Sequence, residues 1–188
     1  MSIRKILLSQ FMLLVICSSI SFAGAFEQSP AVKLVDEFYR RYLAFDHTKT
    51  QGVSQPDISL SKAFSNEVKK STVDCKRFGE GPCGWGDDGD KYLDTQEIDP
   101  NLTYSNSRIS IKEISLGTVR VKLNVYPSEK NAVAYYNKTI TYKIIFENEK
   151  YVVDDIAYSD GISMRKKLLD ERAYIRENVR KNAMGTIK

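Results

Sequence analysis

The sequence predicts an α+β fold, in which two N-terminal helices and a C-terminal helix pack on a curved antiparallel sheet of about four strands. Within residues 26–188, apolar residues recur at helical spacing near both ends, whereas residues 109–158 alternate with the period of strands. Helices followed by a series of strands with short connections are typical of a two-layer α+β domain. We therefore expect a single domain over residues 26–188, a length that can bury one hydrophobic core.

The first 25 residues have the three parts of a signal peptide. Arg4 and Lys5 give a positive start, residues 6–20 form a largely apolar run, and an Ala-Gly-Ala triplet ends at Ala25. The run is shorter than the roughly 20 apolar residues of a membrane-spanning helix, and it leads into a processing site. We predict cleavage after Ala25, export to the periplasm and a mature chain that starts at Phe26.

The charge balance of the mature chain argues against nucleic acid as a partner. The whole chain has 28 basic and 24 acidic residues, and removal of Arg4 and Lys5 with the signal peptide leaves a net charge of about +2. A nucleic-acid-binding domain carries a stronger positive field than this. We expect a partner of another class.

Two cysteines, Cys75 and Cys83, remain after cleavage. Proteins that fold in an oxidising compartment form disulfides, and an even number of cysteines allows complete pairing. Zinc is the competing interpretation, but two thiolates and the one histidine of the chain, His47, do not make a four-ligand site. We predict a disulfide between Cys75 and Cys83, and no cofactor.

Helices are predicted over residues 30–45, 59–73 and 163–182. Ser29 is suited to the N-cap of the first, with proline following at its first position, and Ser163 is suited to cap the last. The expected buried stripes are Val32, Val35, Phe38, Tyr39, Tyr42 and Leu43 in the first helix, Leu60, Ala63, Phe64 and Val68 in the second, and Met164, Leu168, Ile175 and Val179 in the last.

Four strands are predicted between the helices, over residues 109–116, 118–126, 139–146 and 151–158. The short turn at residues 147–150 makes the last two strands a plausible hairpin. The apolar residues that mark these strands are Ile109, Ile111 and Leu116 in the first, Val119, Val121, Leu123 and Val125 in the second, and Ile140, Tyr142, Ile144 and Phe146 in the third.

Several of these segments together resemble a known family. They are the pairs Phe38-Tyr39 and Tyr42-Leu43, the block at residues 90–97, the strand at 151–156 and the segment at 161–168. In this combination the chain resembles the YbjP-like family of small bacterial envelope proteins, a domain of unknown function. The resemblance covers most of the mature chain and implies a cone similar to nuclear transport factor 2, in which helices cover the concave face of a curved sheet and a pocket often lies between them.

The resemblance implies no established reaction. Many members of the family are lipoproteins, whereas in this chain Ile16, and not a small residue, precedes Cys17. We therefore expect no lipid anchor.

The longest irregular stretch, residues 74–100, contains both cysteines, five glycines and the one tryptophan, Trp85. Its acidic residues Asp87, Asp88, Asp90, Asp94, Glu97 and Asp99 outnumber its nearby Lys91, which gives residues 87–99 a net charge of −5. Long loops of this kind in compact domains are often functional. Asp87, Asp88 and Asp90 are candidate calcium ligands, although their spacing does not fit an EF-hand. A solvated acidic surface is the alternative.

Catalytic candidates are few. His47 follows the first helix, and with Asp46 it could act as a general base in a cone pocket lined by Tyr42 and other tyrosines. Asp154 and Asp155 are adjacent in a strand, so we expect them to point to opposite faces, where they cannot act as a pair. The inward one could anchor a buried hydrogen bond. No nucleophile elbow, phosphate-binding glycine loop or metalloprotease helix occurs.

The C-terminal segment is basic, with a net charge of +5 over residues 163–188. A basic amphipathic helix can lie on an anionic membrane or bind an acidic partner, but a stripe of this kind more often packs on its own domain. We find no consistent pattern of ion pairs at i,i+4 along this helix that would explain its charge.

The function favoured by the sequence is non-catalytic binding of a protein partner in the cell envelope. The predicted contact surface is the acidic loop, with Trp85, Asp87, Asp88, Asp90 and Asp94, and peripheral membrane contact through the basic helix is second. One specific version is an immunity protein that neutralises a toxin acting in the periplasm. The alternatives are an enzyme or small-molecule binder that uses Tyr42, His47 and Asp154 in a cone pocket, and a calcium-binding envelope protein.

Overall fold

A computed structural model of the chain describes residues 28–45, 55–78, 83–86, 89–129 and 134–185. The predicted signal peptide lies outside these ranges, as do three of the predicted site residues, His47, Asp87 and Asp88.

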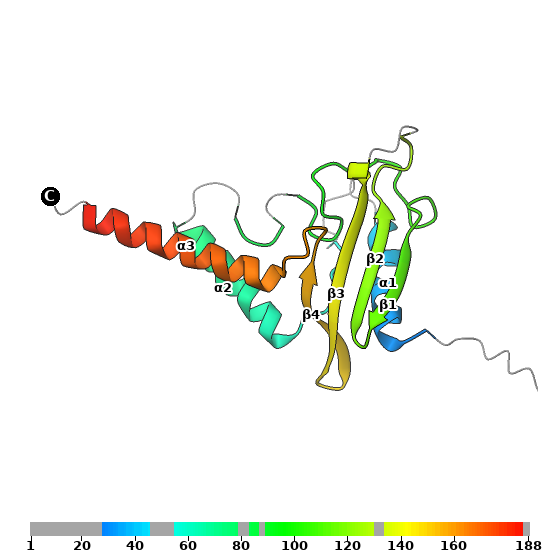
Figure 1. The fold of residues 1–188 in the computed structure, drawn as a ribbon, viewed down its shortest axis with the longest axis horizontal. Helices are drawn as coiled ribbons and strands as arrows, with labels where there is room; N and C mark the ends of the chain where they lie inside the picture. The colour runs from blue at the N-terminus through cyan, green and yellow to red at the C-terminus, as the bar shows by residue number, and fades with distance from the viewer. Residues whose placement is uncertain (1–27, 46–54, 79–82, 87–88, 130–133, 186–188) are drawn as a thin grey trace, which may run out of the picture.

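The described residues form three α-helices and a four-stranded antiparallel sheet, which confirms the predicted α+β class (Figure 1). The strands lie in the order β1-β2-β3-β4, so that each strand pairs with its neighbours in sequence. The elements are α1 (Pro30–Leu43), α2 (Lys62–Phe78), β1 (Ser110–Ser115), β2 (Thr118–Asn124), a 3-10 turn η1 (Ala134–Tyr136), β3 (Asn137–Glu147), β4 (Lys150–Ala157) and α3 (Met164–Gly185).

Helix α1 covers one face of the sheet, behind β1 and β2 in Figure 1. It begins where the sequence predicts, because the Ser29 side chain accepts a hydrogen bond from the backbone N–H of Val32 at 3.3 Å and Pro30 occupies the first turn. All six residues of its predicted stripe are buried. The stripe faces inward-pointing residues of β2 and β3, notably Val121, which pairs with Ile140.

Aromatic rings fill the space between α1 and the sheet. Phe38 contacts the rings of Tyr39, Tyr42 and Tyr92 with centroids 4.6–5.3 Å apart, and all of these side chains are buried. The hydroxyl of Tyr39 donates to the backbone oxygen of Tyr92 at 2.7 Å and lies 2.9 Å from the hydroxyl of Tyr142. Edge-to-face rings with satisfied hydroxyls make a well-packed core. In the part of the chain that the structure describes, Phe38 and tyrosines therefore fill the space between α1 and the sheet.

The two hairpin turns lie at the same end of the sheet, and the structure corrects the predicted position of one residue at each. Leu116, predicted as a strand residue, is fully exposed in the β1–β2 turn beside Gly117. Phe146, one of the apolar residues that marked the third predicted strand, is 64% exposed, because this end of β3 extends beyond α1. The predicted β3–β4 turn is present, with positive φ at Asn148 and Glu149.

Helix α2 begins later and ends later than predicted. Ser61 is its N-cap, since its hydroxyl accepts a hydrogen bond from the N–H of Phe64 at 3.0 Å. The preceding residues pair with the outer edge of β4: the N–H of Ser61 donates to Val153 at 2.7 Å. Of the predicted stripe, Phe64 is buried, Val68 is partly buried and Ala63 is exposed, whereas Leu60 lies before the helix.

A β-bulge in β4 connects the sheet to both remaining helices. The register shifts opposite Lys143, which leaves Asp154 as the extra residue. Asp154 accepts a hydrogen bond from the hydroxyl of Ser61, the N-cap of α2, at 2.9 Å, and Asp155 accepts one from Ser163, the N-cap of α3. Both carboxylates also contact Arg165. We expected Asp154 and Asp155 to alternate between the two faces of a regular strand, but they lie at a bulge. The buried hydrogen bond predicted for one of the two is that between Asp154 and Ser61.

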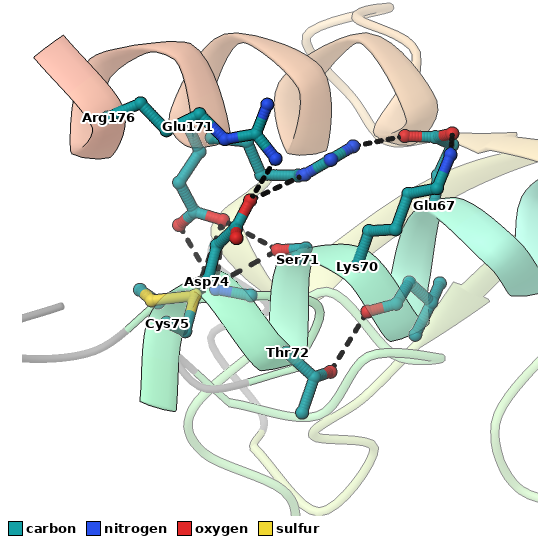
Figure 2. A network of polar contacts seen from close by, with 12 residues as sticks. Glu67, Lys70, Ser71, Thr72, Asp74, Cys75, Glu171 and Arg176 are labelled. Atoms are coloured by element: carbon teal, nitrogen blue, oxygen red, sulfur yellow. Dashed lines mark hydrogen bonds and ion pairs between the residues drawn. A yellow bond between two sulfur atoms is a disulfide. The ribbon is translucent and has the colours of Figure 1, made fainter. Parts of the chain in front are cut away.

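Helices α2 and α3 lie side by side and extend beyond the β4 edge of the sheet (Figure 1). Their contact is polar: Arg172 donates to Asp74 at 3.0 Å and to Glu67 at 2.5 Å, and Arg176 donates to Asp74 at 3.0 Å (Figure 2). The guanidinium of Arg172 holds the pKa of the Asp74 carboxyl below its usual value. The predicted cap and the buried Met164, Leu168 and Ile175 of α3 are confirmed.

Helix α3 carries i,i+4 ion pairs, contrary to the expectation from its sequence. Lys166 pairs with Asp170 at 2.6 Å and Lys181 pairs with Glu177 at 2.8 Å, both at i,i+4.

Within the described residues, no helix combines the length and apolar character that a membrane crossing requires.

Candidate functional site

The candidate site is built around residues 83–86 and 89–96, which we call the loop and which two anchors fix to the helix pair. The predicted disulfide is present: Cys75, in the last turn of α2, is bonded to Cys83, with the two Cα atoms 5.9 Å apart. The carboxylate of Glu171 on α3 is the second anchor. It accepts hydrogen bonds from the N–H of Gly84, at 3.0 and 3.1 Å, and from the hydroxyl of Ser71 on α2, at 3.1 Å (Figure 2).

This arrangement corrects the predicted extent of the loop. Irregular structure was expected from Asp74, but α2 continues to Phe78 and includes both Asp74 and Cys75. The disulfide therefore ties the loop to a helix and not to another part of the same loop. Both helices of the pair contribute to the loop's position.

Trp85 packs against the hydrophobic core. Its ring lies 5.1 Å from Phe64 and 5.6 Å from Tyr92, and its indole N–H donates to the hydroxyl of Tyr158 at 2.9 Å. That hydroxyl donates in turn to the backbone oxygen of Lys91 at 2.7 Å. Burial raises the pKa of Tyr158 well above its usual value, so this hydroxyl stays protonated. Trp85 thus forms the floor of the loop region.

Asp90 organises the turn that follows. It accepts hydrogen bonds from the hydroxyl of Tyr42 at 2.6 Å and from the N–H groups of Tyr92 and Leu93 at 2.9 and 3.0 Å. Gly89 is required beside it, because φ is +146° there and an added Cβ would lie 2.5 Å from a backbone oxygen. The carboxylate of Asp90 is therefore used within the fold.

Two further acids of the segment are also partly or wholly buried. Burial opposes ionisation of Asp99, but hydrogen bonds from Ser128 and Asn101 outweigh it and lower the pKa. Asp94 is half-buried, and burial raises its pKa in spite of Lys138 and Lys167 nearby. Among the described acids of residues 87–99, Asp90, Asp94 and Asp99 therefore do not form the solvated acidic surface that was one interpretation of the sequence.

Few potential metal ligands lie close together near the loop in the described residues. Among the residues that the structure describes, one group of three potential ligands lies within 4.8 Å, namely Cys75, Cys83 and Glu171. The two sulfurs are bonded to each other, so they are not thiolates and cannot hold a metal in this state. Two of the three predicted calcium ligands, Asp87 and Asp88, lie outside the described residues.

A groove of about 480 Å³ lies between the loop and α3. Trp85 and Tyr158 form its aromatic floor, Asp94 and Glu171 supply negative charge, and Lys167 supplies positive charge. Tyr135 of η1 stands on the rim with 59% of its surface exposed, and the ammonium of Lys138 lies 4.1 Å from its ring centroid. The groove offers aromatic surface and charges of both signs on a support that the disulfide fixes.

The predicted site residues fall in three different places. The groove contains Trp85, Asp90 and Asp94. Tyr42 lies in the packed interior, where it also accepts a hydrogen bond from Gln55 at 2.7 Å. Asp154 lies at the N-terminus of α2 and forms no shared site with Tyr42 in the structure.

The sequence did not point to several residues of the groove. Tyr135 lies in η1, Tyr158 directly follows β4, and Lys167 and Glu171 lie on α3, all distant from the loop in sequence. The tyrosine pair just before β3 was the one available signal for Tyr135, because two adjacent tyrosines cannot both face the core of a strand. Nothing local distinguishes Glu171 from the other acids of its helix.

Comparisons with protein-family models, with curated protein sequences and with solved structures found no match. The resemblance to the YbjP-like family and to the cone of nuclear transport factor 2 therefore stays a prediction.

Proposed function

We propose that the protein is an exported, non-catalytic binding protein that holds a segment of a partner protein in the groove between the loop, residues 83–86 and 89–96, and α3. The observation that carries this proposal is the rigid attachment of one groove wall. The disulfide and the carboxylate of Glu171 fix the loop to both helices, so the groove does not have to order itself when it binds. Preorganisation of this kind lowers the entropic cost of association.

The composition of the groove suits a peptide segment better than a small apolar ligand. Exposed tyrosine at the rim is typical of protein-binding surfaces, because its ring and hydroxyl contribute contact area at low entropic cost. Lys167 and Asp94 place opposite charges along the groove, and charges of both signs can fix the direction in which a partner segment binds. Lys167 pairs with Asp160 at 2.6 Å, but its side chain stays 37% exposed and can contact a partner as well. The interior residues proposed for catalysis are instead engaged in the fold, since Tyr42 bonds Asp90 and Asp154 bonds Ser61.

A disulfide supports export, because such bonds persist in oxidising compartments. The periplasm, cleavage after Ala25 and the immunity version of the function belong to this proposal. In that version the partner is a toxin that acts on the cell envelope.

The volume of the groove gives one reason to keep a second candidate. About 480 Å³ is within the usual range of small-molecule pockets. A small-molecule binder would use the floor of the groove, Trp85 and Tyr158, and would not depend on its rim.

Site-specific photo-crosslinking in intact cells tests the proposal. A photoreactive phenylalanine analogue replaces Tyr135 at the groove rim or, as a matched control, Phe146 at the far end of the sheet; the two positions are 59% and 64% exposed. We expect a single discrete protein adduct from position 135 and none from position 146. The adduct should be lost when Lys167→Glu reverses a groove charge.

Two outcomes would overturn the proposal. Equal crosslinking from both positions would show that contact is not specific to the groove. Absence of an adduct at position 135, together with a small molecule that remains bound to the purified protein and is released by Trp85→Ala, would favour the small-molecule candidate.

A further inference from the structure

The two faces of the sheet differ in what covers them. Helix α1 covers the inner face, and α2 and α3 extend beyond β4 (Figure 1). In the described part of the chain, no helix packs on the outer face of β1, β2 and β3, which is turned toward the viewer in Figure 1. We call this the open face.

Basic residues project from the open face on three neighbouring strands. Arg120 and Lys122 alternate with the buried residues of β2, and both are exposed. Lys112 on β1 is the direct cross-strand partner of Arg120, whereas Lys122 is opposite Ser110. Lys143 on β3 is exposed as well and belongs to the same face.

The first three of these cations have no counter-charge within the structure. In the described residues, no ion pair or side-chain hydrogen bond involves Lys112, Arg120 or Lys122. Lys143 differs, because Asp154 lies 3.3 Å from its ammonium. The acid at the end of β3, Glu147, is engaged by the N–H of Lys62 at 2.9 Å.

An unpaired cluster of this kind is unfavourable for the isolated protein. Like charges directly opposite each other on adjacent strands repel, and Lys112 and Arg120 are such a pair. The register would allow an acid at either position to form a favourable cross-strand pair instead. The repulsion is relieved when an anion binds between and above the two side chains.

We propose that the open face binds an acidic segment of a partner protein, at a surface distinct from the groove. Alternate side chains of an extended chain are spaced about 6.6–6.8 Å apart, the same spacing as Arg120 and Lys122 at i,i+2. Carboxylates at alternate positions of an extended acidic segment therefore match the cations. The hydroxyls of Thr141 and Thr139, which are the cross-strand partners of Arg120 and Lys122, are available as further donors.

A membrane fits this face less well than an acidic protein segment. Each surface cation gains only about a fivefold increase in binding to an anionic bilayer, and stable attachment requires an apolar or lipid contribution in addition. The neighbours of Arg120 and Lys122 on β3 are threonines, which do not insert into a bilayer.

Fluorescence anisotropy with a defined probe tests the proposal. The probe is a short fluorescein-labelled peptide of alternating glutamate and threonine, mixed with the mature protein at low ionic strength. The test variant is Lys112→Gln/Arg120→Gln/Lys122→Gln. The matched control, Lys166→Gln/Arg180→Gln/Lys181→Gln, removes three exposed charges from α3 and so gives the same net charge.

We expect the wild-type protein to bind the peptide and the test variant to bind it at least about tenfold more weakly, since each exposed pair contributes a modest, additive share. The control should bind within about twofold of wild type. Binding should also weaken steeply as salt is added. The thermal unfolding midpoint of the test variant should not fall, which establishes that it is folded.

Three results would overturn the proposal. Equal loss in both variants would mean that net charge alone attracts the peptide. Binding of phosphatidylglycerol vesicles without binding of the peptide would assign the face to a membrane. Absence of peptide binding by the wild-type protein at low ionic strength would remove the site altogether. Because Tyr135→Ala alters the groove alone, unchanged peptide binding in that variant keeps this test separate from that of the groove.

Discussion

Helix α3 and the open face both carry clustered cations, but only on the helix do the cations have partners within the chain. On α3, six basic residues form ion pairs with acids of the described chain: Arg165, Lys166, Lys167, Arg172, Arg176 and Lys181. On the open face, Lys112, Arg120 and Lys122 have none in the described residues. A count of charges therefore does not locate a binding surface, because the positions of the counter-charges decide which cations can bind a partner.

The partners of α3 come mainly from α2 and from the segment around β4. Asp74 and Glu67 lie on the side of α2 that faces Arg172, and Asp160 pairs with Lys167 at 2.6 Å. The basic C-terminal helix, predicted as a second contact surface for a membrane or a partner, thus has most of its described charge neutralised within the fold. Membrane contact through α3 stays a proposal, and the ion pairs within the fold make it weaker than the sequence alone suggested.

The largest expected effect is the loss of Arg172. Arg172→Ala leaves the carboxylates of Asp74 and Glu67 close together, with little solvent and one cation fewer. We expect the free energy of unfolding to fall by about 3–5 kcal/mol, the usual cost of removing one partner from a buried ionic network. Urea denaturation measures it.

The matched control is Lys166→Ala on the same helix. Lys166 and Asp170 are both about two-thirds exposed, so we expect a change of no more than about 0.5 kcal/mol. If both substitutions lower the free energy of unfolding equally, the buried pairs of Arg172 stabilise the fold no more than the exposed pair of Lys166 does.

Loss of the disulfide is the next largest effect. Cys75→Ser/Cys83→Ser opens a loop whose ends are eight residues apart, and we expect the free energy of unfolding to fall by about 2.5 kcal/mol. Reduction of the wild-type protein should have the same effect on the urea midpoint. A double variant as stable as the oxidised wild type would show that Glu171 alone holds the loop.

Acid should weaken the contact between α2 and α3. The pKa of Asp74 is lowered in the folded state by Arg172, so its ionised form stabilises the fold above the unfolded pKa of about 3.9. That contribution is lost as the pH falls below about 4 and passes through the folded pKa. We expect Asp74→Asn to be less stable than wild type at pH 7, with the difference narrowing toward pH 3. Thermal unfolding across this range measures it; a constant difference would contradict the pKa shift.

The smallest expected effect has the opposite sign. Lys112→Gln removes the repulsion with Arg120, so we expect the free energy of unfolding to rise by about 0.2–0.5 kcal/mol. Lys122→Gln is the control, because Ser110 is opposite Lys122 and no like charge is removed from a direct pair. Destabilisation by Lys112→Gln would mean that this lysine has a partner in solution.

Local patterns were sufficient for much of the fold. Ser29, Pro30 and the apolar stripe predicted α1, and alternation predicted the strands, because these signals depend on residues a few positions apart. The disulfide followed from the number of cysteines and the compartment. The start of α2 was missed because its cap, Ser61, is identified by contacts with β4, which no local pattern contains.

The candidate site was predicted less completely, for a physical reason. Glu171 reaches Gly84 across 87 positions of the chain, and Arg172 reaches Asp74 across 98. Such contacts depend on how α2 and α3 pack, and a single sequence does not specify that packing. Trp85 and Asp94 were identified through their unusual loop, but the other wall of the groove came from the fold.

NMR observation of the arginine side chains tests the central claim most directly. The Nε–Hε signals of Arg120 and Arg172 are followed while the alternating glutamate–threonine peptide is added to the mature protein. We predict that the Arg120 signal shifts progressively, because its guanidinium has no internal partner, and that the Arg172 signal, held by Asp74 and Glu67, stays in place. A shift of Arg172 with Arg120 unchanged would contradict the account.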